Sequence, residues 1–218
     1  FTANAPDAIV YPTSSRRPEF INAPPDVPGG GAASGSNLAN LSGFPDLIVR
    51  PATEADVVIA MRHARDHGMR VGVRSGGHSW DASFLRDGGM LIDLSRLTKV
   101  GLDVDSGIAF VEPAAHGGDL NAMLGAHRRM FPVGHCPSLG IGGFLLHGGL
   151  GWNSRAGGVG AQSVLAIDVV TADGELVHAD RVHHAELYWA ARGAGPGFFG
   201  VVTRFHLATH PLPRAMMT

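Results

Sequence analysis

The first patterned part of the chain has apolar residues spaced as in a strand, then as in a helix, then again as in a strand. The strand-like runs are residues 46–50 and 71–74, both short and rich in aliphatic side chains. Between them Thr53, followed three residues later by Asp56, predicts the capped start of a helix. The apolar face of that helix is formed by Val57, Met61 and Ala64. We therefore expect a βαβ unit here.

Further short strands and helices are expected along the rest of the chain. Strands are predicted at residues 90–94, 108–112 and 200–208, and helices at residues 118–127 and 185–192. The Asp173-Gly174 turn joins the alternating runs 164–171 and 175–179, which predicts a β-hairpin. Residues 1–45 are rich in Pro, Gly, Ser and Asn with few charges, so they are expected to be irregular.

Charge and composition exclude several classes of partner. The 218 residues carry a net charge of −2 at pH 7, which gives no electrostatic basis for binding nucleic acid or a membrane surface. No apolar run is long enough to span a membrane, and no targeting signal is visible. We expect a soluble protein, either of the bacterial cytoplasm or exported. Cys136 is the only cysteine, so an internal disulfide is excluded.

Glycine is concentrated in two places. Residues 133–160 hold ten glycines together with Cys136, and a second loop, Arg74–Ser79, contains Gly76-Gly77 before His78. Glycine at this density weakens a fold unless the backbone must approach something closely, typically a flat or phosphorylated ligand. Backbone N–H groups of a Gly-Gly turn can bind an anion, although a tight turn with a surface histidine explains the loop equally well. Cys136 is either a buried apolar residue or a reactive group.

Other motifs argue against common alternatives. Residues 195–200 match GxGxxG, but a strand rather than a helix follows, so a Rossmann site is rejected. The chain has no GxxxxGK[ST] phosphate loop and no GxSxG hydrolase motif. No metal site is expected, because neither His63 with His67 nor the pair His183-His184 has HExxH spacing or an acidic third ligand. The other histidines outside the glycine-rich runs are interpreted as structural or surface residues: His116, His127, His178, His206 and His210.

Four runs of sequence, at residues 73–95, 134–152, 164–179 and 186–211, carry a family resemblance. The first contains Val-Arg-Ser-Gly-Gly-His-Ser-Trp and the second Gly-His-Cys-Pro-Ser-Leu-Gly-Ile-Gly-Gly. In this order and spacing they resemble the FAD-linked oxidases with a PCMH-type FAD-binding domain. The resemblance is to the berberine-bridge-enzyme-like branch of the vanillyl-alcohol-oxidase superfamily, which includes 6-hydroxynicotine oxidase and bicovalent sugar oxidases.

The resemblance implies an α+β fold of two subdomains, a small βαβ-containing lobe and a mixed or antiparallel sheet with helices. The FAD-binding domain would cover residues 46–212, divided into 46–98 and 99–212. Residues 213–218 would begin a substrate domain that this sequence lacks. The sequence is therefore expected to be a fragment or one chain of a cleaved protein, with the substrate domain further along the reading frame or on a second chain.

The resemblance also implies FAD bound through two covalent bonds. His78 falls on the family's histidine that bonds the flavin 8α-methyl, and Cys136 on the cysteine that bonds flavin C6. A thiolate and an imidazole are nucleophiles suited to an electron-poor ring. The remaining positions implied to contact FAD are Arg74, Ser75, Gly76, Gly77, Ser79, Gly134, Ser138, Leu139, Gly142, Gly143, His147, Gly148, Gly149, Gly200 and Val202.

The implied reaction is hydride transfer from a CH–OH or CH–NH carbon to flavin N5, with O2 as acceptor giving H2O2. The implied substrate is a small molecule of the sugar, alkaloid or secondary-metabolite type. The catalytic base is expected in the part that this sequence lacks, because neither Tyr11 nor Tyr188 matches a family position.

Three departures from the family pattern keep alternatives open. Residues 155–163 lack the aromatic residue and the aspartate that relatives often have, and Phe198-Phe199-Gly200 replaces Asn-Phe-Gly. Leu139 falls on a family position where oxidases have valine. A bulkier leucine there can shield the flavin from oxygen. A dehydrogenase and a non-catalytic flavin-binding module are therefore the alternatives. A flavin-free domain would have no use for the glycine-rich composition.

Overall fold

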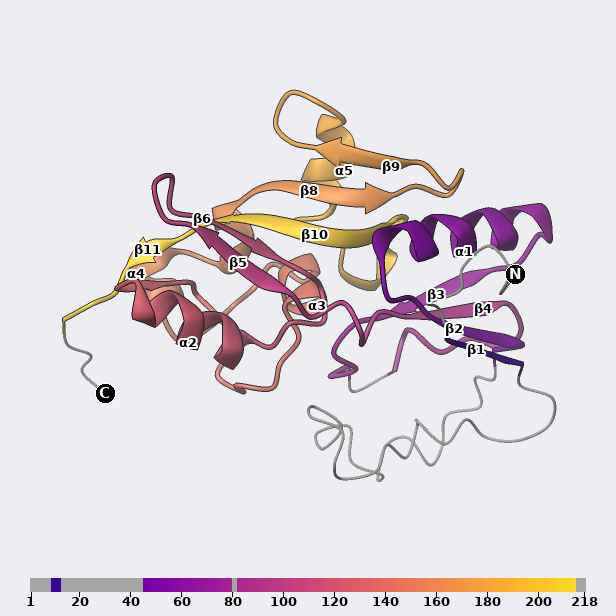
Figure 1. Ribbon diagram of the computed structural model, residues 1–218, viewed down its shortest axis with the longest axis horizontal. Coiled ribbons are helices and arrows are strands. Elements are labelled where there is room, and N and C mark those ends of the chain that lie inside the picture. Colours follow the sequence, from indigo (N-terminus) through magenta and orange to yellow (C-terminus); the bar gives the residue numbers. More distant parts are fainter. Residues whose placement is uncertain (1–8, 13–44, 80–81, 215–218) are drawn as a thin grey trace.

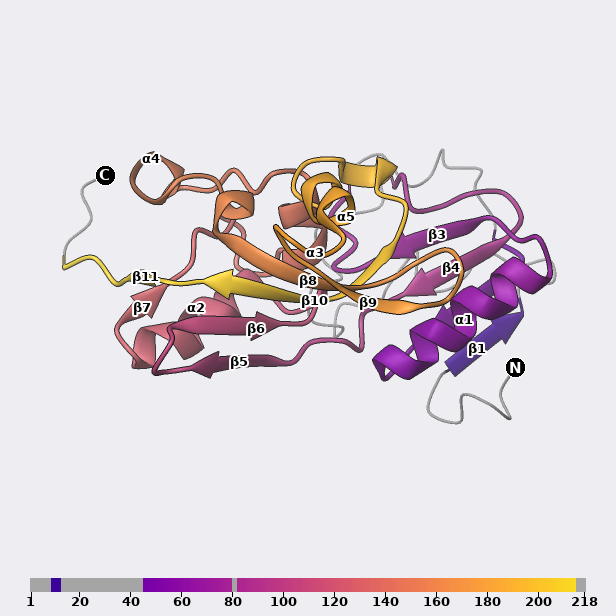
Figure 2. The same cartoon turned by 90° about the horizontal axis from the view of Figure 1, so that it is seen from above.

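Two sheets lie side by side along the long axis of the protein, with one long helix between them (Figure 1). The structure is a computed structural model and describes residues 9–12, 45–79 and 82–214. Figure 2 shows the same arrangement from above. Helices and strands are mixed as expected for the α+β class, so the predicted fold class is confirmed.

The first sheet is mixed and contains the predicted βαβ unit. Its strands, in spatial order, are β1 (Ile9–Pro12), β2 (Leu47–Arg50), β4 (Met90–Asp93) and β3 (Val71–Arg74). Strand β4 pairs in parallel with both β2 and β3, while β1 pairs antiparallel with β2. Helix α1 (Glu54–Asp66) connects β2 to β3, so β4 occupies the place between the two strands that the helix links.

Helix α1 is fixed at its start by side chains and along its length by both sheets. Thr53 Oγ1 accepts a hydrogen bond from Asp56 N at 3.2 Å, and the Asp56 carboxylate accepts one from Thr53 N at 3.0 Å, which completes a capping box. The buried face of α1 packs on β4 and also on Val170 and Val201 of the second sheet. Arg62 adds a hydrogen bond to the Gly174 carbonyl at 3.0 Å.

The second sheet is entirely antiparallel. Its strands, in spatial order, are β5 (Val100–Asp103), β6 (Ile108–Val111), β10 (Val201–Ala208), β8 (Val164–Val170) and β9 (Leu176–Ala179). The larger core of the protein is built on this sheet, with fully buried Phe131 and Phe205 among its members. Helix α2 (Gly117–Ala126) and helix α5 (Ala185–Ala190) pack on it, and Tyr188 of α5 donates a hydrogen bond to the Val164 carbonyl at 2.8 Å.

Several short elements escaped the sequence patterns because they are too short to show a period. They are β7 (Arg129–Met130), α3 (Ile141–Leu146), α4 (Ser154–Gly157), η3 (Gly160–Ser163), η4 (Gly195–Gly197) and β11 (His210–Pro211). Strand β5 was missed as well, because Gly101 interrupts its apolar run. Helix α3 matters most, since it lies within the glycine-rich stretch where Gly142 and Gly143 lower the helix propensity.

The structure corrects one predicted boundary, that of the irregular N-terminal segment. Within residues 1–45, which were expected to be irregular, Ile9–Pro12 forms strand β1, where Ile, Val and Tyr favour an extended backbone. The rest of that segment up to residue 44 lies outside the described residues, as do Trp80, Asp81 and residues 215–218. The division of the FAD-binding domain into subdomains of residues 46–98 and 99–212 stays a prediction. In the part of the chain that the structure describes, no helix is both long and apolar enough to cross a membrane.

We expect Phe205→Ala to lower the free energy of unfolding by about 3–5 kcal/mol, because it leaves a cavity in the centre of the larger core. Urea denaturation followed by circular dichroism measures the change. Phe110→Ala is the matched control, since Phe110 lies on the neighbouring strand with 39% of its surface exposed. That variant should lose less than about 1 kcal/mol. Equal losses in the two variants would contradict this assignment of the core.

Candidate functional site

A cavity of about 760 Å³ opens where the two sheets meet. Most of its walls come from three segments that are far apart in the sequence. They are strand β3 with the loop after it (residues 71–79), helix α3 with its flanks (residues 139–150), and the turn that leads into β10 (residues 195–202). The two glycine-rich segments singled out in the sequence therefore face one cavity. A cavity of this size is in the range of cofactor sites.

The two glycine-rich segments touch backbone to backbone. A Cβ atom on Gly76 would lie 2.8 Å from Gly140 N, and one on Gly140 would lie 2.8 Å from Gly76 Cα. A Cβ on Gly142 would lie 2.8 Å from the Pro113 side chain. Glycine is thus required at these positions by protein packing. The expectation that a ligand explains the glycines is too broad, because part of the glycine density serves the contact between the loops.

Other glycines leave backbone open to the cavity. At Gly143 the nearest atom to an added Cβ is Ser75 Oγ, at 3.8 Å, so no protein atom fills that space. Gly143 N donates a hydrogen bond to Ser75 Oγ at 3.3 Å, which joins helix α3 to the loop after β3. At this point the cavity wall is backbone, and a flat ligand can approach it closely.

Arg74 forms a buried ion pair with Asp93, which supports the loop after β3. Its guanidinium lies 3.1 Å from Asp93 Oδ2, and the Arg50 guanidinium lies 3.5 Å from the same oxygen. The Asp93 carboxylate is 1% exposed, so its charge needs these partners. Gly77, with φ of +71°, turns the backbone tightly over the Arg74 guanidinium. Arg74 lines the cavity, and its charge is shared with Asp93.

Ser138 lies between His78 and Cys136, the two residues predicted to bond flavin. Ser138 Oγ lies 3.4 Å from His78 Nε2 and 3.6 Å from Cys136 Sγ. Burial lowers the pKa of His78, and repulsion from His116 acts in the same direction, while a hydrogen bond with the Ser138 backbone opposes both. The imidazole is therefore neutral at pH 7 and keeps a nucleophilic nitrogen.

In the turn before β10, sequence analysis assigned only Gly200 to the site. Residues 195–200, rejected as a Rossmann motif, form η4 and its exit, and Phe198 and Phe199 line the cavity. The rejection stands, because strand β10 follows the motif directly. His147, at the end of helix α3, donates a hydrogen bond from Nδ1 to the Gly143 carbonyl at 2.7 Å, and its ring lies against Gly195 of this turn. The predicted FAD contacts Gly200 and Val202, at the end of this turn and just after it, were the sequence signal that could have pointed to Phe198 and Phe199.

Most of the predicted site residues line the cavity. Those that do are Arg74, Ser75, Gly76, Gly77, His78, Ser79, Leu139, Gly142, Gly143, His147, Gly149, Gly200 and Val202. Those that lie outside its lining are Gly134, Cys136, Ser138 and Gly148. Cavity-lining residues that were not predicted include Phe84, Arg86, Pro113, Phe144, Leu150, Phe198 and Phe199. These are mostly apolar side chains, and single apolar residues carry no motif.

We expect Gly76→Ala to destabilise the protein by roughly 2 kcal/mol or more, because its Cβ would displace the Gly140 backbone. The melting temperature, measured by differential scanning fluorimetry, should fall by several degrees. Gly125→Ala is the matched control. A Cβ there meets nothing within 4 Å, and alanine favours helix α2 by about 0.5 kcal/mol or more. A Gly76→Ala variant as stable as the control would show that the two loops do not need this contact.

Comparisons with known proteins identify the family of this chain. Residues 45–180 match the model of a family described as FAD binding domain. Over 191 residues the chain is 39% identical to the FAD-linked oxidoreductase janO of Penicillium janthinellum, covering 88% of this chain and 42% of that protein. The chain thus spans about two fifths of the length of this curated relative.

Solved structures match the fold over nearly the whole chain. The structure of 6-hydroxy-D-nicotine oxidase from Arthrobacter nicotinovorans aligns with a TM-score of 0.79 at 30% identity, covering 95% of this chain and 43% of that one. Two variants of Phl p 4, one described as a glucose dehydrogenase and the other as a glucose oxidase, each align with a TM-score of 0.81 at 27% identity. Each alignment covers 94% of this chain and 41% of the variant. The chain belongs to the FAD binding domain family, and its relatives include FAD-linked oxidoreductases.

Proposed function

We propose that this chain is the FAD-binding part of a flavin-dependent oxidoreductase and that it holds FAD in the cavity between the two sheets. The observation that carries the proposal is the cavity of about 760 Å³ that both glycine-rich segments line, in a chain of the FAD binding domain family. When bound, FAD would accept a hydride at N5 from a CH–OH or CH–NH carbon and pass the electrons to O2, giving H2O2.

The residues present fit this cofactor. The loop Arg74–Ser79 offers backbone N–H groups beside a glycine turn, which suits the pyrophosphate. The open backbone at Gly143 suits the approach of a flat ring system, and the ion pair of Arg74 with Asp93 keeps the loop in place. Ser75, which bonds to Gly143 N, ties the two walls together, so both are positioned before FAD enters.

His78 and Cys136 are the proposed covalent anchors. Each would give up the hydrogen of its N–H or S–H group and gain a bond to a flavin carbon, which also loses one hydrogen. Two electrons and two protons are released for each bond, and O2 would take them up as H2O2. The neutral imidazole of His78 and the thiol of Cys136, both beside Ser138, support this assignment.

The electron acceptor depends on how the flavin is shielded. Leu139 lines the cavity and packs against Gly134, where its Cδ2 fills the space that a side chain would take. One isoleucine-to-valine replacement separates the Phl p 4 variant described as a glucose oxidase from the one described as a glucose dehydrogenase. The size of one aliphatic side chain is thus linked with the acceptor in a relative. A dehydrogenase that reacts poorly with O2 is therefore the second candidate.

The substrate is proposed to be a small molecule of the sugar, alkaloid or secondary-metabolite type. Relatives include a xylooligosaccharide oxidase and a carbohydrate oxidase by name. Among the described residues, Tyr188 cannot serve as catalytic base, because it is 3% exposed and donates its hydroxyl proton to the Val164 carbonyl. The base is proposed to lie outside residues 1–218, as are the residues that select the substrate.

Incubation of the purified chain with FAD in air tests the covalent proposal. After acid precipitation and proteolysis, mass spectrometry should find one flavin joining the peptides of His78 and Cys136. His78→Ala should retain only the bond to Cys136, and Cys136→Ser only the bond to His78. His135→Ala, next to Cys136, is the control and should bind as the unmodified chain does. Flavin that is bound but released by acid would contradict the covalent anchors, and a colourless protein would contradict the FAD site itself.

Leu139→Val should make the reduced flavin react faster with O2, by several-fold, because a smaller side chain opens the approach to the ring. Photoreduction of the FAD-loaded chain followed by stopped-flow mixing with aerated buffer measures this rate without a substrate. Leu146→Val, which also shortens a leucine of the cavity wall, should leave the rate unchanged. Equal rates in the Leu139→Val variant and the unmodified chain would remove Leu139 from control of the acceptor.

A further inference from the structure

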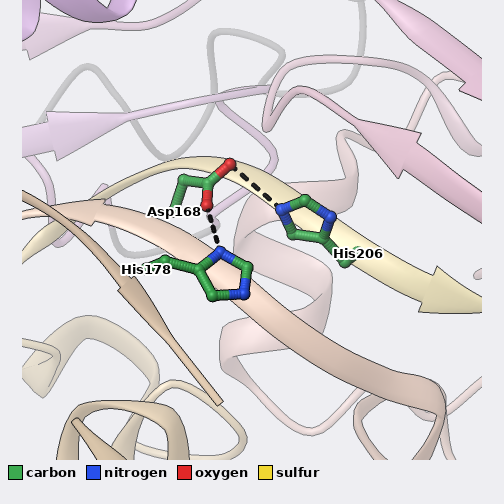
Figure 3. Close-up of side chains that lie close together, drawn as sticks. All are labelled: Asp168, His178 and His206. Carbon is green, nitrogen blue, oxygen red and sulfur yellow. Dashed lines mark hydrogen bonds and ion pairs between the residues drawn. The ribbon is translucent and has the colours of Figure 1, made fainter. Parts of the chain in front are cut away.

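Three side chains converge on the second sheet, on strands next to one another (Figure 3). Asp168 lies on β8, His178 on β9 and His206 on β10. Asp168 pairs directly with His178 in the sheet register, while His206 pairs with Ala166, two residues before Asp168. Residues two apart in a strand share a face, so the register alone places the three side chains together.

The three side chains direct ligand atoms at one another. His178 Nδ1 lies 2.7 Å from Asp168 Oδ1, and His206 Nε2 lies 3.0 Å from Asp168 Oδ2. All three ligand atoms lie within 4.8 Å of one another. In a tetrahedral zinc site, ligands about 2.0–2.2 Å from the ion lie roughly 3.3–3.6 Å apart. The two contacts to Asp168 would therefore lengthen by a few tenths of an ångström to admit an ion, and side-chain rotation would bring the two imidazole nitrogens to the same spacing.

We propose that Asp168, His178 and His206 bind a divalent transition-metal ion of the zinc class. Two imidazole nitrogens and one carboxylate oxygen are ligands that zinc accepts, and water would complete the coordination. Sequence analysis expected no metal site and interpreted His178 and His206 as structural or surface residues. That expectation considered spacing along the chain, whereas this cluster is assembled across three strands by their register.

A change of tautomer frees the two imidazole nitrogens for an incoming cation. Without an ion, His178 Nδ1 and His206 Nε2 face the Asp168 carboxylate as hydrogen-bond donors. Each ring must therefore carry its proton on the other nitrogen when it binds a metal ion. The His178 side chain is 51% exposed, so its ring can carry its proton on Nε2, in contact with water, when Nδ1 binds the ion.

Two neighbours shape this site. The Arg204 guanidinium lies 3.5 Å from Asp168 Oδ2 and would repel a cation there, but it also lies 3.2 Å from the Glu54 carboxylate. Glu54 can keep Arg204 paired when the ion takes the Asp168 oxygen. Phe110 packs edge-on against the His206 ring, with 5.6 Å between ring centroids, and limits how that ring can turn. An ion held here would connect β8, β9 and β10.

The test is a zinc titration of the purified chain, without a histidine tag and in metal-free buffer. Isothermal titration calorimetry should show one Zn²⁺ ion bound per chain, and Zn²⁺ should raise the melting temperature. Co²⁺ in place of Zn²⁺ should give the visible absorption bands of a tetrahedral site. His178→Gln should weaken binding by more than about tenfold, since loss of an outer-shell partner alone costs 10–100-fold in affinity.

His183→Gln is the matched control, because His183 contacts a single carboxylate, that of Asp180, at 3.1 Å. It should bind Zn²⁺ as the unmodified chain does. Circular dichroism confirms that both variants fold. Three results would overturn the proposal: no Zn²⁺ binding by the unmodified chain, undiminished binding by His178→Gln, or equal loss in His183→Gln. None of these readouts depends on FAD.

Discussion

The contact of Gly76 with Gly140 is the constraint on which the cavity depends. At this point the loop after β3 of the first sheet meets the start of helix α3. Helix α3 packs on the second sheet. Backbone lies against backbone with no side chain between, so the separation of the two walls is fixed by main-chain geometry. The Ser75–Gly143 hydrogen bond joins the same two segments, and the Arg74–Asp93 ion pair holds the start of the loop against β4. His78 and Ser138 owe their proximity to this contact.

The sequence predicted best where a pattern is long or a motif is local. The capped helix α1, the hairpin of β8 and β9, and the strand before His78 follow from apolar spacing and turn residues, and the structure confirms them. The pairing of two glycine-rich loops around one cavity came from the family resemblance. Spacing along the chain does not show which loops meet in space.

The parts that escaped prediction have physical reasons of their own. Helix α3 is six residues long and contains two glycines, so tertiary contacts hold it where its own propensity would not. Its first N–H groups bond to the Ala115 and Pro113 carbonyls and to Ser75. Phe198 and Phe199 reach the cavity because a short turn precedes β10, and the cluster of Asp168 with two histidines depends on strand register. Each of these is a property of the assembled fold.

Helix α1 makes the first and second sheets depend on each other. By sequence it belongs to the first sheet, yet its buried face covers Val170 and Val201, and Arg62 and Arg65 bond to the turn between β8 and β9. Removing residues 46–98 would uncover apolar surface on the second sheet. The two halves therefore cannot be exchanged between homologues as separate modules, since a transplanted first half would bring a helix surface matched to its original partner. A chimaera built from this chain would have to keep α1 and the β8–β9 hairpin together.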